Sequence, residues 1–439
     1  MPDAGERPRT PENAPPGTLR PPRTSAPPPG TLAPLRRPDF RRIWIGHGLS
    51  ALGSHLTGLA LPLLILDQTG SPLLAGLAGT LRMLAYLVAH LPAGALADRL
   101  RRRNILLVAD VARGLCVVAI GIALVVGEPL SVPVLLTLSV LSAVVSSVAD
   151  PAGQAATRHL VDGGELPAAL ALDGVRGQAI GLAAPLVGGL LYQIWPPLPF
   201  LVDAGSYAMS FLLVYAVRRP LGGGTPGRPA SLLSDITTGV RYIGHSSFLR
   251  LYLVWAALGN FATAGIAFLV VLAVLPSGGT AVGAALACVS LGGLVGAALA
   301  PRAVAVPAGT AVPAVTGVRL LIAGVIAVRP TPVVLATGMT LIALLGPLVS
   351  VRYNAGLFTL VPDHLMGRVQ SAMTLVGGSL YPFAAVLAGW LAEAMSIRTA
   401  MLAMAGVLGV VFALGLLRTL RPPERTAPAP AESVPEPVT

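Results

Sequence analysis

Residues 94–103 read Gly-Ala-Leu-Ala-Asp-Arg-Leu-Arg-Arg-Arg and join two long apolar runs, 73–97 and 104–126. About 20 apolar residues are enough for a helix to cross the hydrocarbon core of a bilayer. The connector is too short to form a domain, and a cluster of arginines beside a membrane is typical of a cytoplasmic loop. The stretch therefore predicts two membrane-spanning helices that are joined on the cytoplasmic side.

The composition of the whole chain agrees with a lipid environment. Only 11% of the 439 residues are charged, whereas soluble domains average about 25%. The net charge of +11 comes from arginines in short loops and tails, so we assign it to membrane orientation and not to nucleic-acid binding. Cys116 and Cys288 lie inside apolar runs and offer no disulfide or metal framework.

Twelve apolar runs lie between two Pro-rich tails, and their length and number favour membrane-spanning helices over buried soluble ones. The first six are 43–66, 73–97, 104–126, 131–156, 168–193 and 199–217. The second six are 248–275, 282–300, 310–328, 332–357, 368–393 and 399–417. Basic loops alternate with loops of little charge, which predicts that both termini are cytoplasmic.

The longest internal connector divides the runs into two sets of six. Residues 40–44 (Phe-Arg-Arg-Ile-Trp) resemble residues 248–252 at an offset of 208, and Gly189-Leu190-Leu191 recurs as Gly389-Trp390-Leu391 at an offset of 200. Repeated echoes of this kind indicate a duplicated six-helix bundle. The expected divisions are a disordered tail (1–38), an N-terminal bundle (39–217), a cytoplasmic linker (218–247), a C-terminal bundle (248–420) and a second disordered tail (421–439).

The connector quoted first resembles the loop between helices 2 and 3 of the major facilitator superfamily, Gly-x-Leu-x-Asp-Arg-x-Gly-Arg-Arg. The matching residues are Gly94, Leu96, Asp98, Arg99, Arg102 and Arg103. Arg101 takes the place of the usual glycine. The resemblance implies that Asp98 latches the cytoplasmic face shut together with Arg99, Arg102 and the region near Arg368. The alternative is that Asp98 only neutralises neighbouring arginines.

A second motif lies in the fifth run, where Ala-Pro-Leu-Val-Gly-Gly resembles the Gly-Pro-x-x-Gly-Gly motif of proton-coupled exporters in that superfamily. The relevant residues are Gly181, Pro185, Gly188 and Gly189. Proline bends a helix and glycines permit close helix contact, which could close one side of a cavity. Ordinary glycine-rich packing is the alternative.

Further likeness in residues 40–44, 97–99 and 109–113 places the chain near the bacterial efflux branch of the superfamily, with its macrolide-efflux-like and enterobactin-exporter-like proteins. The resemblance implies an all-α integral membrane protein with twelve transmembrane helices in two pseudo-symmetric bundles. It also implies proton-coupled efflux of a drug-like or siderophore-like molecule by alternating access. An importer or uniporter of the same fold, or a membrane subunit of a larger complex, is the alternative.

Polar residues inside the spans are expensive and therefore mark candidate substrate or proton pathways. We select His55, Arg82, Asp110, Arg113, Asp203, Tyr207, Asn260, Arg319 and Asn354. Arg113 and Arg319 are repeat mates, which favours a structural role, whereas Arg82 is expected to meet substrate or a buried acid. Asp203 and Tyr207 could line the cavity or bond to each other.

For other polar residues we expect simpler roles. His55 and His90 could titrate near neutral pH, but satisfied buried histidines are the favoured reading. Asp150 and Asp173 are expected near cytoplasmic helix ends, as latches or caps.

Energy and partners follow from what the sequence lacks. It contains no phosphate-binding Gly-x-x-x-x-Gly-Lys loop and no clustered metal ligands, so we expect neither an enzyme nor a cofactor. A proton gradient is the expected energy source. The expected partners are a small molecule and the lipid bilayer of a bacterial cell, and the chain is expected to act as a monomer.

Overall fold

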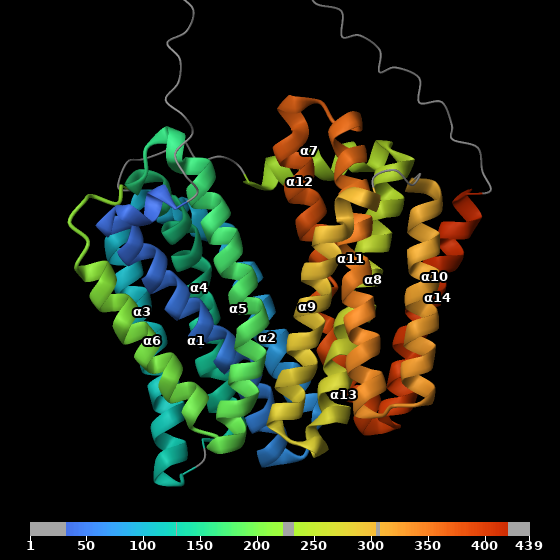
Figure 1. The fold of residues 1–439 in the computed structure, drawn as a ribbon, viewed down its shortest axis with the longest axis horizontal. Coiled ribbons are helices and arrows are strands. Elements are labelled where there is room, and N and C mark those ends of the chain that lie inside the picture. Colours follow the sequence, from blue (N-terminus) through green and yellow to red (C-terminus); the bar gives the residue numbers. More distant parts are fainter. Residues whose placement is uncertain (1–31, 129, 223–231, 304–307, 420–439) are drawn as a thin grey trace, which may run out of the picture.

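The computed structural model describes residues 32–128, 130–222, 232–303 and 308–419. The two tails lie largely outside these residues, so their expected disorder stays a prediction. Within the described residues the chain folds into helices that gather in two bundles, α1–α6 on the left and α8–α14 on the right of Figure 1.

The N-terminal bundle holds the first six long helices. They are α1 (Pro38–Thr69), α2 (Pro72–Arg99), α3 (Arg102–Val126), α4 (Val132–Leu160), α5 (Leu166–Ile194) and α6 (Leu198–Tyr215). Proline in the first turn of α1 and α4 suits a helix start, because its missing N–H has no partner there. Gly70 and Gly127 end α1 and α3 with φ of 66° and 83°, a backbone conformation that favours glycine.

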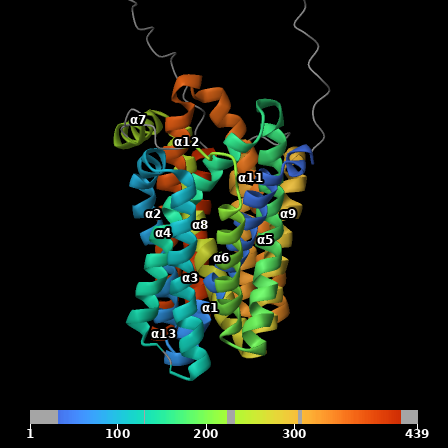
Figure 2. The ribbon, with the colours of Figure 1, turned by 90° about the vertical axis from the view of Figure 1, so that its left-hand side faces the viewer.

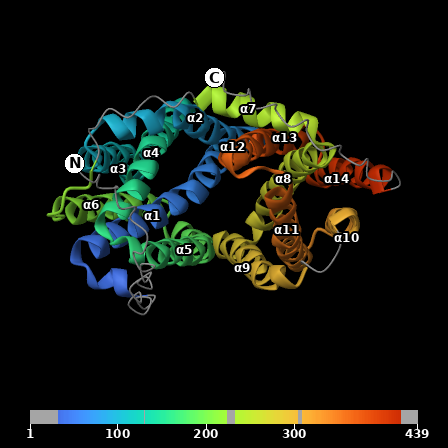
Figure 3. The same cartoon turned by 90° about the horizontal axis from the view of Figure 1, so that it is seen from above.

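The C-terminal bundle follows the linker. Its helices are α8 (Ser247–Val274), α9 (Gly279–Ala303), α10 (Ala308–Val328), α11 (Pro332–Leu360), α12 (Asp363–Gly378), α13 (Tyr381–Ala394) and α14 (Ile397–Thr419). Three short 3₁₀ turns complete the described elements: η1 (Ala33–Arg36), η2 (Gly163–Glu165) and η3 (Leu275–Ser277). Figure 3 shows the two bundles side by side from above.

The expected fold class is confirmed. Eleven helical stretches of the described chain are long and apolar enough to cross a membrane, and Pro313–Val328 of α10 is a shorter apolar one. One expected span differs in shape, because residues 368–393 form two helices, α12 and α13, separated at Ser379 and Leu380. Gly378 before the break and Pro382 after it both disfavour a continuous helix.

The linker also contains a helix that the sequence did not indicate, α7 (Leu232–His245). It packs against α12, and Figure 2 shows it beside α12 at the top of the molecule. Gly239 permits the contact, because a Cβ there would collide with the backbone of Arg368 and lie 2.8 Å from the Ala372 Cβ.

The bundles meet through two helix pairs, α2 with α13 and α5 with α9, which we call the seams. Figure 1 shows these helices converging at the end of the molecule opposite the start of α1. We call that end the seam side, and the end where α1 begins and α14 stops the terminal side. The seams include side-chain bonds from Thr80 Oγ1 to the Pro382 carbonyl (2.5 Å) and from Ser290 Oγ to the Gly181 carbonyl (2.8 Å).

Candidate functional site: a polar cavity inside the N-terminal bundle

A cavity of about 590 Å³ opens among α1, α2, α3, α4 and α6. Its charged and titratable lining residues are His47, His55, Arg82, Tyr86, Asp110, Arg113, Asp150 and Tyr381. All of them except Tyr381 of α13 come from the N-terminal bundle. Ser50, Ser54, Ser146 and Ser210 add hydroxyl groups to the wall. A charged side chain in a membrane span normally faces such an interior, where water and partners offset its cost.

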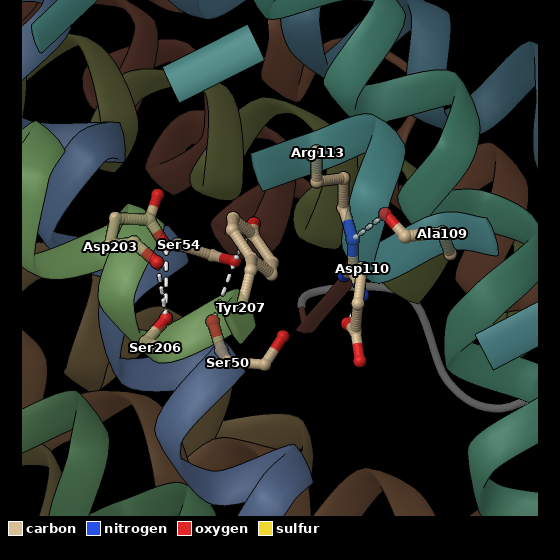
Figure 4. Close-up of polar contacts among 8 residues, drawn as sticks. All are labelled: Ser50, Ser54, Ala109, Asp110, Arg113, Asp203, Ser206 and Tyr207. Atoms are coloured by element: carbon tan, nitrogen blue, oxygen red, sulfur yellow. Dashed lines mark hydrogen bonds and ion pairs between the residues drawn. The ribbon is translucent and has the colours of Figure 1, made fainter. Parts of the chain in front are cut away.

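Asp110 and Arg113 form a buried ion pair on α3. The Arg113 Nη2 donates to Asp110 Oδ1 at 2.8 Å, and its Nε donates to the Ala109 carbonyl at 3.2 Å. The guanidinium carbon also lies 4.7 Å from the centre of the Tyr207 ring, a distance typical of a cation–π contact. Figure 4 shows the pair beside Tyr207 of α6. The spacing of three residues on one helix therefore produces the pairing that the sequence allowed.

Asp203 on α6 is buried one layer behind the cavity, and only 1% of its surface is exposed. Its carboxylate accepts a hydrogen bond from Thr57 Oγ1 at 2.6 Å and another from Ser206 Oγ at 3.3 Å. Gly53 allows this approach, because a Cβ there would lie 2.9 Å from the Asp203 Cα. Within the described residues, no arginine or histidine lies within ion-pair distance of this carboxylate.

Tyr207 sits one turn further along α6, and its hydroxyl lies 2.8 Å from Ser54 Oγ of α1. Figure 4 shows the contact between Tyr207 and Ser54. Asp203 and Tyr207 therefore each bond to α1 and not to each other, and neither is among the residues that line the cavity. The sequence offered lining or mutual bonding, and the structure has neither. The reason is that α1 packs closely along α6 and supplies hydroxyl partners for both residues.

A polar face of α2 forms the opposite wall, where Arg82 and Tyr86 line the cavity, and His90 follows one turn later, outside the lining residues. The Tyr86 hydroxyl donates to Asp150 Oδ2 of α4 at 3.0 Å, and its ring stacks on His90 with centroids 5.3 Å apart. Asp150 was expected near a helix end as a latch or cap, which is wrong. Because α4 continues to Leu160, Asp150 lies almost three turns inside the helix and lines the cavity.

Arg82 faces the same space from beside Gly58 of α1, where an added Cβ would lie 3.5 Å from its Nη1. Within the described part of the chain, its guanidinium has no hydrogen bond or ion pair. Its cavity position fits the expectation of contact with substrate or an acid, and that role stays a prediction.

The two histidines picked from the sequence are not buried. His55 is exposed to the cavity, and its Nδ1 lies 2.9 Å from the Ala51 carbonyl. His90 is also exposed, with its Nδ1 3.1 Å from the Ser147 carbonyl. The interpretation of both as satisfied buried histidines is wrong on exposure, because His55 faces the cavity and His90 lies at an exposed position of α2.

His47 was missed by the sequence reasoning and also lines the cavity. Its ring lies against Gly153 of α4, where a Cβ would collide with it. The signal that could have found it is the helical spacing of lining positions along α1: His47, Ser50, Ala51, Ser54, His55 and Gly58. That spacing of three and four residues marks one face of a helix.

The remaining candidates lie away from this cavity. Asn260 is exposed on α8 and is not among the lining residues. The buried Arg319 of α10 lies over the Trp255 ring at 5.9 Å and donates to the Ile342 carbonyl at 3.3 Å. The side chain of Asn354 lies outside the described residues. The structure thus brings the N-terminal candidates together and leaves those of the second half apart.

The connector between α2 and α3 is described only in part. The side chains of Gly94, Leu96, Asp98 and Arg99 lie outside the described residues, so the latch stays a prediction. Arg102 Nη1 donates to the Leu221 carbonyl at 3.3 Å, and Arg103 Nη2 donates to the Tyr215 carbonyl at 2.5 Å. Both arginines thus bind carbonyls at the end of α6 and just beyond it.

The glycine motif of α5 lies in the α5–α9 seam. Gly189 is packed so closely on Gly279 and Gly283 that a Cβ at Gly189 would lie 3.0 Å from the Gly283 backbone. A Cβ at Gly283 would in turn lie 2.6 Å from the Pro185 carbonyl oxygen. Gly188 instead faces Leu56 and Leu59 of α1, and the Gly181 carbonyl accepts the bond from Ser290. The motif therefore sits where one end of the space between the bundles is closed.

We also searched the described residues for a group of side chains that could bind a metal ion. Among the described residues, no group of three His, Cys, Asp or Glu side chains could hold a metal ion.

Comparison with known proteins gives the chain its family. The model of the transmembrane secretion effector family matches residues 29–439. The multidrug efflux pump Tap of Mycolicibacterium fortuitum is 29% identical over 383 residues, covering 82% of this chain and 91% of the relative. The enterobactin exporter EntS of Shigella boydii is 32% identical over 157 residues, covering 35% of this chain and 37% of that protein.

Solved structures share the fold at low sequence identity. The nucleoside transporter NupG superposes with a TM-score of 0.68 at 12% identity, covering 88% of this chain and 100% of that one. A bacterial homologue of the iron transporter ferroportin, in an inward-facing state, gives a TM-score of 0.65 at 14% identity, covering 87% of this chain and 99% of that one. Together with the two helical bundles, the family match shows that the chain belongs to the transmembrane secretion effector family of the major facilitator superfamily of membrane transporters.

Proposed function

We propose that the chain is a proton-coupled efflux transporter that works by alternating access between its two bundles. The terminal side faces the cytoplasm of a bacterial cell, because the arginine-rich connectors lie there. The seam side then faces outward, and the structure corresponds to a state that is closed toward the outside. Efflux, as opposed to import, is supported by the similarity to a multidrug efflux pump and to an enterobactin exporter.

One observation carries the proposal: a carboxylate and an arginine without an ion pair face the same cavity inside the spans. Asp150 is bonded to the Tyr86 hydroxyl, and Arg82 has no partner within the described residues. Asp150 is half-buried between membrane spans, where a carboxylate costs free energy that either a cation or a proton can offset. Asp150 therefore exchanges protons with the cavity, and the substrate competes for the same groups.

The cavity limits the substrate to a small organic molecule. Its volume of about 590 Å³ falls within the range of about 300–1,000 Å³ found for ligand pockets. Arg82 offers a cation for an acidic or oxygen-rich group, and Tyr86 and Tyr381 offer ring surfaces. A drug-like or siderophore-like compound fits this lining. The chain acts as a monomer in the plasma membrane, without a cofactor and without catalysing a chemical reaction.

Transport into everted membrane vesicles tests the proposal directly. Everted vesicles that contain the chain should accumulate compounds from a panel of fluorescent dyes and acidic antibiotics when respiration acidifies their interior. An uncoupler should abolish the accumulation, and each transported compound should release protons from the vesicles. Accumulation that survives the uncoupler would refute proton coupling, and uptake only into right-side-out vesicles would identify an importer.

A further inference from the structure

The two seams end in the same contact, made twice. At the end of α13, Glu393 Oε2 accepts the backbone N–H of Leu73 at 3.1 Å, in the first turn of α2. At the end of α5, Gln193 Oε1 accepts the backbone N–H of Thr280 at 2.8 Å, in the first turn of α9. Each side chain thus reaches across from one bundle and caps a helix of the other.

The two contacts are related by the internal duplication. Gln193 and Glu393 are 200 positions apart, as are Gly189 and Gly389, and Leu73 and Thr280 are 207 positions apart. Gly389 packs on Pro72, where a Cβ would lie 2.9 Å from the carbonyl carbon, just as Gly189 packs on Gly279. The backbone geometry of the seams has therefore been kept in both copies.

The chemistry of the two caps differs. Glu393 carries a carboxylate, and its Oε2 also accepts a hydrogen bond from Ser71 Oγ at 2.6 Å. Gln193 carries a neutral carboxamide, and the position that matches Ser71 is Gly278, which has no hydroxyl. An anion at a helix N-terminus is favoured by the helix dipole, and hydrogen bonds to a charged acceptor are stronger than neutral ones. Of these two caps, the one at the α2–α13 seam has the titratable group.

We propose that Glu393 is a proton-binding site on the seam side, and that proton binding there loosens the α2–α13 seam and favours opening toward the outside. The proposal rests on the proposed function, because it supplies the step at which an external proton begins the return of the cavity to the outer face. The Glu393 and Gln193 side chains are both exposed, so water reaches them. By linkage, the closed seam binds the proton less well than the open one, so a lower external pH shifts the equilibrium toward opening.

The groups around Glu393 leave it as the charged member of this contact. The helices packed against α13 are α2, α8 and α14. Their ionisable residues with described side chains include Arg82, Tyr86 and His90 on α2 and Arg398 in the first turn of α14. On α8, Arg250 and Tyr252 lie at the far end of the helix. Within the described residues, none of these groups forms an ion pair with Glu393.

A distance measurement across the seam side tests the proposal without any transport. Ser131 and Thr331 are exposed residues just before α4 and α11, one on each bundle. Both are changed to cysteine, with Cys116→Ala and Cys288→Ala, and carry spin labels in the full chain reconstituted in nanodiscs. Pulsed electron paramagnetic resonance then gives the population with a long distance, which is the outward-open state. Lowering the pH from about 8 to about 4, where glutamate titrates, should raise the outward-open population about two- to threefold.

Two matched variants assign the effect to the cap. Glu393→Gln makes both caps neutral, and the rise in the open population across the same pH range should then be smaller than in the parent chain, because only the cavity groups such as Asp150 remain to titrate. Adding Gln193→Glu to Glu393→Gln moves the carboxylate to the other seam and should restore the rise. An unchanged rise in Glu393→Gln, or no rise in the parent chain, would overturn the proposal. If the open population rises at low pH while efflux survives an uncoupler, the proposed proton-coupled function fails and the Glu393 proton site stands. If the uncoupler abolishes efflux but the open population does not rise at low pH, only the Glu393 proton site is refuted.

Discussion

The two bundles share one fold but differ in where they carry charge. The N-terminal spans hold Asp110, Asp150, Asp173 and Asp203. Helices of this bundle also supply nearly all of the residues that line the cavity. In the described C-terminal helices the carboxylates are Asp363 and Glu393, each near a helix end. The core of that bundle is a large apolar cluster that includes Ile266, Leu269, Ile326 and Ile342.

This difference teaches how a duplicated fold can divide its work. In the proposed function the N-terminal bundle carries the cavity groups for protons and substrate, whereas the C-terminal bundle contributes an apolar body and the Glu393 cap at the seam. The seams remain alike in backbone geometry, because both bundles must meet there. The following predictions, from the largest expected effect to the smallest, test whether the division holds.

Asp150→Asn should abolish gradient-driven accumulation in everted vesicles, because the amide cannot bind and release the coupling proton. Passive exchange of the same dye should persist. The matched control is Asp173→Asn on α5, whose carboxylate pairs with Arg176 at 3.1 Å and does not line the cavity. Equal loss of accumulation in both variants would remove the special role of the cavity carboxylate.

The same substitution at the two repeat arginines should have unequal costs. Arg113→Gln leaves the buried Asp110 without its cation, and we expect a loss of about 3–5 kcal/mol of stability. Arg319→Gln strands no carboxylate within the described residues and should cost only about 1 kcal/mol for a lost hydrogen bond. Thermal unfolding of both variants in the same detergent measures the difference. Equal costs would mean that the C-terminal bundle also hides an essential charge pair.

The seams, in contrast, should respond alike. Gly189→Val and Gly389→Val each place a side chain against backbone of the other bundle, an overpacking that costs about 1–3 kcal/mol. Each should therefore raise the outward-open population by at least about fivefold in the spin-label experiment. Gly181→Ala is the control, since nothing lies within 4 Å of a Cβ there. A response in only one seam would contradict their equivalence.

Arg82→Gln should raise KM for acidic compounds about tenfold, the loss expected when one charged hydrogen bond of about 1.4 kcal/mol disappears. The maximal rate should change less, since Asp150 remains. Arg82→Lys keeps the charge and should recover part of the affinity. Unchanged KM in Arg82→Gln would place this arginine outside the substrate pathway.

Much of the fold follows from the sequence, because lipid demands long apolar helices and arginines mark their ends. Two features did not follow. The helix α7 is short and follows a Gly- and Pro-rich stretch, and it depends on its packing against α12 and α8, which the sequence does not reveal. The break between α12 and α13 lies inside one apolar run. Hydropathy indicates that such a run lies in the membrane, but it does not show whether the helix is continuous.

The candidate site was only half accessible to such reasoning. Arg82, Asp110 and Arg113 stood out because charge is rare in a span. Asp150 was misplaced because its depth was counted from an expected helix end that came several residues too early. His47 was overlooked because a cavity depends on which helices separate, and that is a tertiary property. The seam caps could have been found from the sequence, because the offset of 200 residues that relates Gly189 to Gly389 also relates Gln193 to Glu393, four residues further on.

The close approach of glycines at the seams has an evolutionary consequence. A boundary built from main chain against main chain depends on its own glycines and little on the side chains that line the cavity. The cavity wall, in contrast, consists of serines, histidines and other replaceable side chains. Selection can therefore alter which compounds are carried without disturbing the closing surfaces, and variants with a changed resistance spectrum should accumulate along α1, α2 and α4.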